Sequence, residues 1–419
     1  MNFSVGTVLL PMDDHQPEAS RLVAYGFVYA VLQQGIGVYR VIQAQDETAF
    51  MKTDLHPDGV DFLGGPILFS AKDAVAVKAI RDASFSTVVV ETLFEEFQPR
   101  EVFASFGAPS IGIIYGSPWL GRVDKLLDEM GVAYFAYKIA EVEAAPSLLS
   151  AFDLVVDDCV GWFPFGPPAP VISVLQDLVV AGKELIFTDL ALADLMICFP
   201  GKITASPNGI NGPSQLINFI FHNNGDFVTQ YAGSETVGLR LHVAGAIITE
   251  VTEDVQIAVD SNVYPGYGYG IAVAYFKSSY GLVEAFCYHS VDQLGESFET
   301  IYAAAALLGN KLLEGYHQYF FIPIEDTNIL ALNLAEGSSH TVTLTIKDRE
   351  IPVEGVPVRF HIIGGPHTCQ VGQATTDENG VASWTYSGTM YGTDIIVAYY
   401  ELDGVEYETY EIYKTWIPA

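Results

Sequence analysis

Basic residues are scarce in this chain. Among its 419 residues, 19 Lys and Arg stand against 51 Asp and Glu, which gives a formal net charge of −32 at pH 7. Such a charge repels nucleic acids and anionic lipid surfaces, so the sequence predicts neither as a partner. It is instead typical of extracellular proteins and of salty habitats, and it favours divalent cations such as Ca²⁺. A cytoplasmic protein from an acid-rich proteome is the alternative.

Cysteines are also few, and long apolar runs are missing. The four cysteines form no C-x-x-C pair, which excludes a zinc ribbon and a thioredoxin motif. Cys159, Cys198 and Cys287 lie in or beside apolar runs, which predicts buried free thiols. The chain contains no stretch of 18 apolar residues, so the sequence predicts no transmembrane helix. The first residues lack the basic start of a signal peptide, so we expect either a cytoplasmic protein or a mature chain.

Strand and helix patterns alternate through the first two-thirds of the chain. Val5 to Met12 is an apolar run that predicts a strand buried on both faces, and Glu18 to Gln34 follows with a broad apolar helical face. This alternation predicts an α/β domain over residues 1–325, with a mostly parallel sheet and helices on both faces. A Gly- and Asn-rich segment at about 201–270 predicts a β-rich insertion.

The pattern changes near the end of the chain. Residues 326–339, which end in E-G-S-S, predict a linker. Short alternating strands without a helical pattern then fill residues 340–419 and predict a β-sandwich.

Three motifs in that last segment carry a resemblance. They are G-V-P-V-R-F at 355–360, T-T-D-E-N-G-V-A at 375–382 and G-T-D at 392–394. The second motif is a strand, a tight turn that needs a positive φ at Asn or Gly, and a return strand. Over about 80 residues the segment resembles a bacterial Ig-like module of the invasin and intimin type. The resemblance implies a spacer or adhesive unit on the cell exterior.

The segment G-K-E-L-I-F-T-D-L-A, residues 182–191, holds a predicted strand followed by a sharp turn at Thr188-Asp189. Together with the strand at 152–156 and a late strand ending at His289, this order resembles the class I glutamine amidotransferase-like fold, which has a flavodoxin-like sheet. The resemblance implies a Cys nucleophile in the turn and a later His-x-Glu pair. Here Asp189 stands at the nucleophile position, and Val291 stands where the Glu would follow His289. The matched positions therefore predict no catalysis of that kind.

Acidic residues recur just after predicted strands. If the strands are parallel, these residues share one edge of the sheet, where α/β folds bind ligands. With His15 they predict a ligand or divalent-cation site, while solvated loop acids are the alternative. Cys159 is the one cysteine that could serve as an amidotransferase nucleophile, but it follows the strand at 152–156, one strand too early, and neighbouring carboxylates disfavour its thiolate. The predicted site comprises Asp13, Asp14, Asp157, Asp158, Asp189 and His289.

Tyrosines gather in a Gly-rich segment and in the last strands. The last strands alternate apolar residues with Glu, which fits a half-buried strand and also a strand that pairs with another chain. The predicted assembly surface comprises Tyr264, Tyr267, Tyr269, Tyr407 and Tyr410.

Together these patterns predict a non-catalytic extracellular or cell-surface protein from a bacterium or an archaeon. We expect it to assemble with itself or with other envelope proteins into a layer, sheath or filament, without a cofactor other than Ca²⁺ or another divalent cation. One alternative is a surface hydrolase or transferase that uses the strand-end acids. Another is a carbohydrate or small-ligand binding protein with Trp162 or Tyr267 lining a groove.

Overall fold

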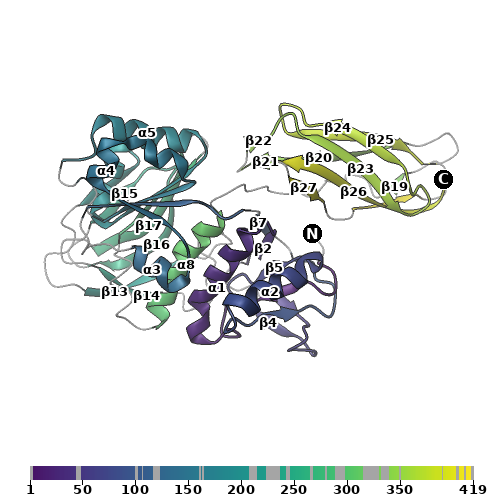
Figure 1. The fold of residues 1–419 in the computed structure, drawn as a ribbon, viewed down its shortest axis with the longest axis horizontal. Coiled ribbons are helices and arrows are strands. Elements are labelled where there is room, and N and C mark those ends of the chain that lie inside the picture. Colours follow the sequence, from purple (N-terminus) through teal and green to yellow (C-terminus); the bar gives the residue numbers. More distant parts are fainter. Residues whose placement is uncertain are drawn as a thin grey trace. The chain divides into compact units, whose positions relative to one another are not determined.

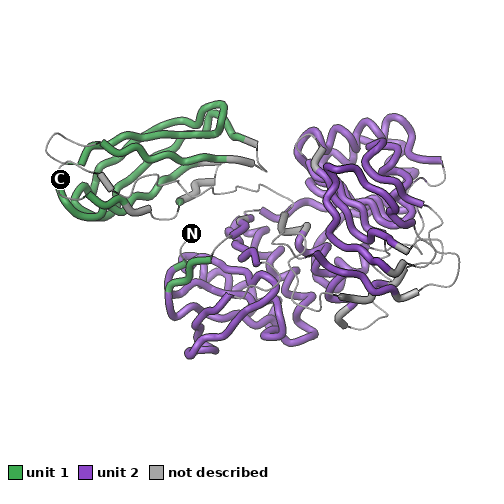
Figure 2. The backbone as a smooth tube through the Cα atoms, turned by 180° about the vertical axis from the view of Figure 1, so that it is seen from behind, with its two compact units in different colours: residues 1–3, 96–99, 317–419 green, residues 4–95, 100–316 purple. Residues whose placement is uncertain are grey.

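The chain forms two compact units in a computed structural model (Figure 2). One unit holds residues 4–95 and 100–316, and the other holds residues 317–419 with 1–3 and 96–99. The structure describes residues 3–43, 49–99, 102–105, 107–116, 123–159, 162, 165–206, 215–222, 236–241, 246–264, 268–278, 281–287, 298–314, 330–331, 339–348, 351–388, 390–402, 405–409 and 412–416.

The larger unit begins with an antiparallel sheet of five strands in the order β6-β1-β5-β2-β7. Its inner strand β1, between β6 and β5, is fully buried, as its apolar sequence predicts. Figure 1 shows β2, β5 and β7 of this sheet near helices α1 and α2. Helices α1 and α2 contact each other beside this sheet, and a hairpin of β3 and β4 precedes β5. The bounds are β1 Val8–Leu10, α1 Glu18–Leu32, β2 Val38–Val41, β3 Ala49–Met51, β4 Val60–Phe62, β5 Ile67–Phe69, η1 Ala71–Asp73, α2 Ala74–Ser84, β6 Glu91–Thr92 and β7 Val102–Ser105.

The second sheet of this unit is mixed and has eleven strands. Its path runs β14-β13-β16-β17-β18-β11-β10-β8-β9, with β12 and β15 attached beside β17. The stretch from β18 to β9 is parallel, and the remaining pairs are antiparallel. The strands are β8 Ile111–Tyr115, β9 Phe135–Lys138, β10 Leu154–Asp158, β11 Glu184–Thr188, β12 Ile203–Ser206, β13 Gln215–Phe221, β14 Thr236–Leu241, β15 Ile247–Val251, β16 Gln256–Tyr264, β17 Gly268–Ser278 and β18 Gly281–Phe286.

Helices bury the parallel part of this sheet. Apolar side chains of α5 and α6 share one core with alternate residues of β10, β11 and β18, including Val155, Leu185 and Val283. Helix α8 contacts α1 and β14. The helices are α3 Val123–Met130, α4 Ile139–Ala144, η2 Pro146–Ala151, α5 Ala169–Val180, η3 Asp189–Ala191, α6 Leu192–Cys198 and α8 Phe298–Glu314.

The predicted fold class, a mostly parallel flavodoxin-like sheet with helices on both faces, is wrong. Antiparallel pairs dominate the described residues, and strands β1, β2, β5, β6 and β7 belong to a separate sheet. Apolar runs reveal buried strands without their direction. The length of a connection does indicate strand direction, because very short connections join antiparallel strands. Strand β17 ends at Ser278 and β18 begins at Gly281, and the two strands form an antiparallel hairpin. The segment predicted as an insertion supplies strands β12 to β17 of the main sheet.

The smaller unit consists of strands over residues 339–416 as far as the structure describes them. A sheet with the path β19-β28-β26-β23-β24 carries β27 on β26, and β20 pairs with β25. The two sheets meet through side chains such as Phe360 and Trp384, whose rings stack 6.0 Å apart. Strands β21 and β22 pair with each other in a separate ladder. The strands of this unit are β19 Leu330–Ala331, β20 Ser339–Thr345, β21 Lys347–Asp348, β22 Ile351–Pro352, β23 Pro357–Gly364, β24 Val371–Thr375, β25 Val381–Ser387, β26 Gly392–Leu402, β27 Val405–Glu408 and β28 Ile412–Trp416.

Most of the predicted linker, residues 326–339, lies outside the described residues; within it, β19 pairs with β28. Of the helices that the structure describes, none is both long enough and apolar enough to cross a bilayer.

Candidate functional site

Asp189 occupies the sharp turn that the sequence predicts. Strand β11 ends at Thr188, the 3-10 helix η3 begins at Asp189, and the φ of Asp189 is +46°. A non-glycine residue seldom adopts this left-handed conformation, and its cost must be offset by surrounding contacts. Its Oδ1 accepts a hydrogen bond from the Ala246 backbone N–H at 2.8 Å, and its Oδ2 lies 3.6 Å from Cys159 Sγ. The buried carboxylate therefore connects three segments of the chain.

Cys159 lies directly after β10 and shares this strained geometry. Its φ is +62°, it is fully buried, and its backbone N–H donates to Thr188 Oγ1 at 2.8 Å. Its thiol points at the Asp189 carboxylate, an arrangement that disfavours a thiolate. These contacts favour a structural role for Cys159 over that of a nucleophile.

Asp158 fixes the start of a helix. Its Oδ2 accepts from the backbone N–H of Val123, the first residue of α3, at 2.9 Å. Its Oδ1 accepts from Thr188 Oγ1 at 2.9 Å. A carboxylate is stabilising at a helix N-terminus, where backbone N–H groups lack helical partners.

Asp157 points to the opposite face of β10 and meets Asp194 of α6. In the described part of the chain, no N–H or O–H group reaches either oxygen of Asp157 or Oδ1 of Asp194. Two buried carboxyl groups whose facing oxygens lack other donors are stabilised when they share a proton, because two neighbouring anions would repel each other. Burial and the nearby Asp194 charge raise the pKa of Asp157 well above its usual range. Burial likewise raises the pKa of Asp194 to about 6, although a hydrogen bond from the Trp162 backbone N–H opposes this shift.

Cys198 lies near the same pair. Burial, followed by the charges of Asp157 and Asp194, raises the pKa of its thiol to about 12. A thiol of this kind stays protonated and does not act as a nucleophile near neutral pH.

The predicted strand-end site divides between two places. Asp157, Asp158 and Asp189 lie at the same edge of the mixed sheet, where parallel β10 and β11 end. Asp13 and Asp14 instead follow β1 of the antiparallel sheet. His289, the last predicted member, lies outside the described residues.

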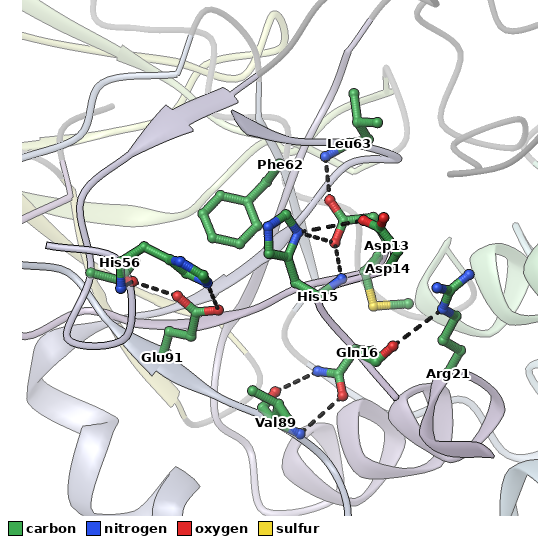
Figure 3. Close-up of polar contacts among 12 residues, drawn as sticks. Asp13, Asp14, His15, Gln16, Arg21, His56, Phe62, Leu63, Val89 and Glu91 are labelled. Atoms are coloured by element: carbon green, nitrogen blue, oxygen red, sulfur yellow. Dashed lines mark hydrogen bonds and ion pairs between the residues drawn. The ribbon is translucent and has the colours of Figure 1, made fainter. Parts of the chain in front are cut away.

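Asp13 and His15 form a hydrogen-bonded dyad in the loop after β1 (Figure 3). Asp13 is buried, and its Oδ1 accepts from His15 Nδ1 at 2.8 Å and from the His15 backbone N–H at 3.0 Å. Its Oδ2 accepts from the Leu63 backbone N–H at 2.6 Å. Asp14 is 82% exposed, and its Oδ1 lies 3.8 Å from His15 Nδ1. These three side chains have the atoms to hold a cation, but N–H donors already engage both oxygens of Asp13.

A second histidine lies against the first. The rings of His15 and His56 meet edge to face with their centroids 5.2 Å apart, and Phe62 lies 4.8 Å from the His15 ring. His56 Nε2 is 3.6 Å from Glu91 Oε1 (Figure 3). The Thr53 hydroxyl donates to the other Glu91 oxygen. Burial raises the pKa of Glu91, while this hydroxyl opposes the shift.

Sequence reasoning missed this second pair. His56 and Glu91 lie far from His15 along the chain and form no motif with it. The available signal was a carboxylate, Glu91, directly after the apolar run Val88 to Val90.

The tyrosines and Trp162 are described only in part. The Tyr269 hydroxyl donates to Asp260 Oδ2 at 2.8 Å, and burial followed by this bond raises its pKa to about 12. Trp162 is buried in the apolar core of the larger unit, and its Nε1–H donates to Glu143. The side chains of Tyr264, Tyr267, Tyr407 and Tyr410 lie outside the described residues.

The smaller unit carries a depression of about 360 Å³ on the outward face of β23, β24 and β26. Sequence reasoning missed it because the side chains come from three strands and meet only through their register. Its lining residues are Pro357, Val358, Arg359, Gln373, Ala374, Thr375, Tyr399 and Tyr400.

No protein-family model matches this chain, and no curated protein matches it either. Among solved structures, a β-galactosidase from Bacillus circulans sp. alkalophilus is 11% identical with a TM-score of 0.33, and the match covers 74% of this chain and 44% of that one. The protein SMU.1228c is 11% identical with a TM-score of 0.35, and the match covers 48% of this chain and 99% of that one.

A β-galactosidase from the Antarctic haloarchaeon Halorubrum lacusprofundi is 11% identical with a TM-score of 0.30, covering 68% of this chain and 40% of that one. The chain thus matches less than half the length of either β-galactosidase. At these TM-scores none of the likenesses bears on function.

Proposed function

We propose that this is a non-catalytic protein of the bacterial or archaeal cell surface that assembles with copies of itself into a layer, sheath or filament. One observation carries the proposal: the residue in the strand-to-helix turn is a buried Asp189 whose two oxygens are already engaged. A nucleophile must reach its substrate, and this carboxylate is instead part of the packing.

An exposed edge strand supports assembly. Strand β9 pairs with β8 on one side, and no other described strand pairs with its opposite side. Phe135 at its start is 63% exposed, and the following Ala136 is exposed as well. An edge strand of this kind offers free backbone groups and apolar area to a strand from another copy.

Net charge sets the condition for assembly. Two copies that each carry a charge of −32 repel one another, and this repulsion opposes close contact. Divalent cations between exposed carboxylates, such as that of Asp14, would offset it. The extracellular location rests on this acidity and on the resemblance of residues 340–419 to bacterial Ig-like modules.

Sedimentation velocity and negative-stain electron microscopy test the proposal, on the full chain with CaCl₂ and with a chelator. We expect ordered assemblies with Ca²⁺ that dissociate on chelation. Phe135→Lys places a charge on the edge strand and should raise the concentration needed for assembly by about tenfold or more. Val75→Lys, at an exposed position of α2, is the matched control and should behave like the wild type. A monomer at every concentration with Ca²⁺ present would refute the proposal.

The Asp13–His15 dyad favours a second candidate, a surface hydrolase or transferase. Because Asp13 accepts from Nδ1–H, the tautomer leaves Nε2 as the proton acceptor of His15. Within the described residues Nε2 makes no hydrogen bond, and the His15 side chain is 19% exposed. A general base with these properties can remove a proton from water or from a hydroxyl group.

A panel of 4-nitrophenyl esters, phosphates and glycosides tests this candidate. Turnover that falls by about 100-fold or more in His15→Ala, and stays unchanged in the control His222→Ala at a partly exposed histidine outside the dyad, would support it. Equal rates in His15→Ala and the wild type would rule out catalysis by this dyad.

A further inference from the structure

The depression on the smaller unit lies within one sheet. The strand register places Arg359 between Gln373 on β24 and Tyr399 on β26, and it pairs Pro357 with Thr375 in the next row. Val358 and Tyr400 are buried, so they contribute backbone to the floor. Its volume of about 360 Å³ lies within the range of about 300–1,000 Å³ that is typical of small-molecule sites.

Tyr399 provides an aromatic surface in a fixed orientation. The Arg359 guanidinium lies over its ring, 5.8 Å from the centroid. The His361 ring meets the same ring edge to face, with the centroids 5.2 Å apart. Contacts from two neighbours restrict the rotamers of Tyr399 before any ligand arrives, which reduces the entropy that binding must offset.

The polar groups around this ring are of mixed type. Arg359 offers N–H donors, Gln373 offers a donor and an acceptor in one amide, and Thr375 offers a hydroxyl that can do either. Among the lining side chains that the structure describes, none carries a carboxylate. A wholly apolar ligand would cover polar groups without offering them hydrogen bonds, which costs binding free energy. A polyanion would meet the repulsion of a chain with a net charge of −32.

A pyranose ring satisfies these conditions because it carries hydroxyl groups around its rim and C–H groups on its face. We propose that the depression binds a neutral carbohydrate, with a sugar ring against Tyr399 and its hydroxyl groups bonded by Arg359, Gln373 and Thr375. The proposal stands independently of self-assembly, and it gives the smaller unit a polysaccharide as its partner.

Calorimetric titration of the full chain with cellohexaose, mannohexaose and β-1,4-galactohexaose tests this site. We expect at least one of them to bind. Tyr399→Ala should weaken that binding by about fivefold or more because it removes the aromatic surface. Gln373→Ala should weaken it by about threefold or more through a lost hydrogen bond. Tyr391→Ala, which changes a 60% exposed tyrosine outside the depression, is the matched control and should bind as the wild type does.

Gln373→Ala keeps the test decisive if Tyr399→Ala fails to fold, because Gln373 is exposed on the edge strand β24. The proposal is overturned if none of the three oligosaccharides binds at concentrations up to about 10 mM. It is also overturned if a folded Tyr399→Ala and Gln373→Ala both bind as tightly as the wild type.

Discussion

The thiol of Cys159 lies 3.6 Å from Oδ2 of Asp189, and both residues have a positive φ. The two follow neighbouring parallel strands, so each strained turn is held in part by the other. The Asp189 carboxylate connects the turn after β10 to the segment at Ala246, because its second oxygen accepts a hydrogen bond from the Ala246 backbone N–H.

Asp189→Ala should lower the free energy of unfolding of the larger unit by about 2–3 kcal/mol. The Ala246 N–H loses its partner, and alanine tolerates the left-handed conformation poorly. Asp189→Gly should cost less because glycine adopts this φ without strain. Urea denaturation followed by circular dichroism gives both values, with Asp128→Ala on the exposed face of α3 as control. Equal losses for the alanine and glycine variants would contradict the strain at this turn.

The Asp157–Asp194 pair makes stability depend on pH. Both pKa values are raised in the folded protein, so folding binds protons at these groups. Their contribution is therefore fully present below the unfolded pKa of about 3.8 and is lost as the pH rises through the folded pKa of about 6 for Asp194 and through the raised pKa of Asp157. Asp157→Asn supplies a neutral N–H donor to Asp194 and should flatten this dependence, with a gain on the order of 1–3 kcal/mol at pH 8.

Urea denaturation at pH 5 and pH 8 measures that difference, with Asp153→Asn as a carboxylate control beside the same strand. If the wild type and Asp157→Asn lose the same stability between the two pH values, the shared proton is refuted.

Asp394 holds one end of the smaller unit together. It is fully buried and accepts from Trp416 Nε1 at 2.7 Å, from the Tyr386 hydroxyl at 3.0 Å and from both the backbone N–H and Nδ1 of His367. Asp394→Ala leaves these donors buried without an acceptor and should cost about 3–5 kcal/mol. Tyr386→Phe removes one bond and should cost about 0.5–1.5 kcal/mol. Tryptophan fluorescence during denaturation reports both, and Tyr391→Phe should match the wild type.

Gly26 permits a close approach of α1 and the end of α3. A Cβ at this position would lie 1.8 Å from the Met130 carbonyl oxygen, which is backbone and cannot rotate away. Gly26→Ala should therefore destabilise the larger unit by about 2 kcal/mol or more, despite the gain of about 1 kcal/mol that alanine normally brings to a helix. In Gly309→Ala the new Cβ meets the Tyr25 ring, a side chain, and the loss should be smaller. Thermal denaturation ranks the two, and the reverse order would contradict the packing.

The sequence predicted local features better than long-range ones. The turn at Asp189 follows from a strand that ends at Thr188, and both can be recognised from adjacent residues. Strand direction depends on partners far along the chain, so β1 was correctly predicted as buried while its antiparallel pairing with β5 was not.

Candidate sites divide in the same way. Asp13 and His15 are two residues apart, so their proximity could be predicted, whereas the contact of His15 with His56 depends on the hairpin of β3 and β4. The row of Gln373, Arg359 and Tyr399 depends on the register of three strands. A change of one residue in that register would send each side chain to the opposite face of the sheet.

Asp394 lies on β26, and its donor Trp416 lies on β28, the last strand described. During synthesis on the ribosome, the buried carboxylate therefore has no indole partner until residues 412–416 have emerged. Without this bond the buried carboxylate has lost one of its donors, which disfavours closure of the core. We expect this unit to stay open until that strand arrives and then to fold in one step, so that a chain cut short before Trp416 exposes an incomplete core to proteases.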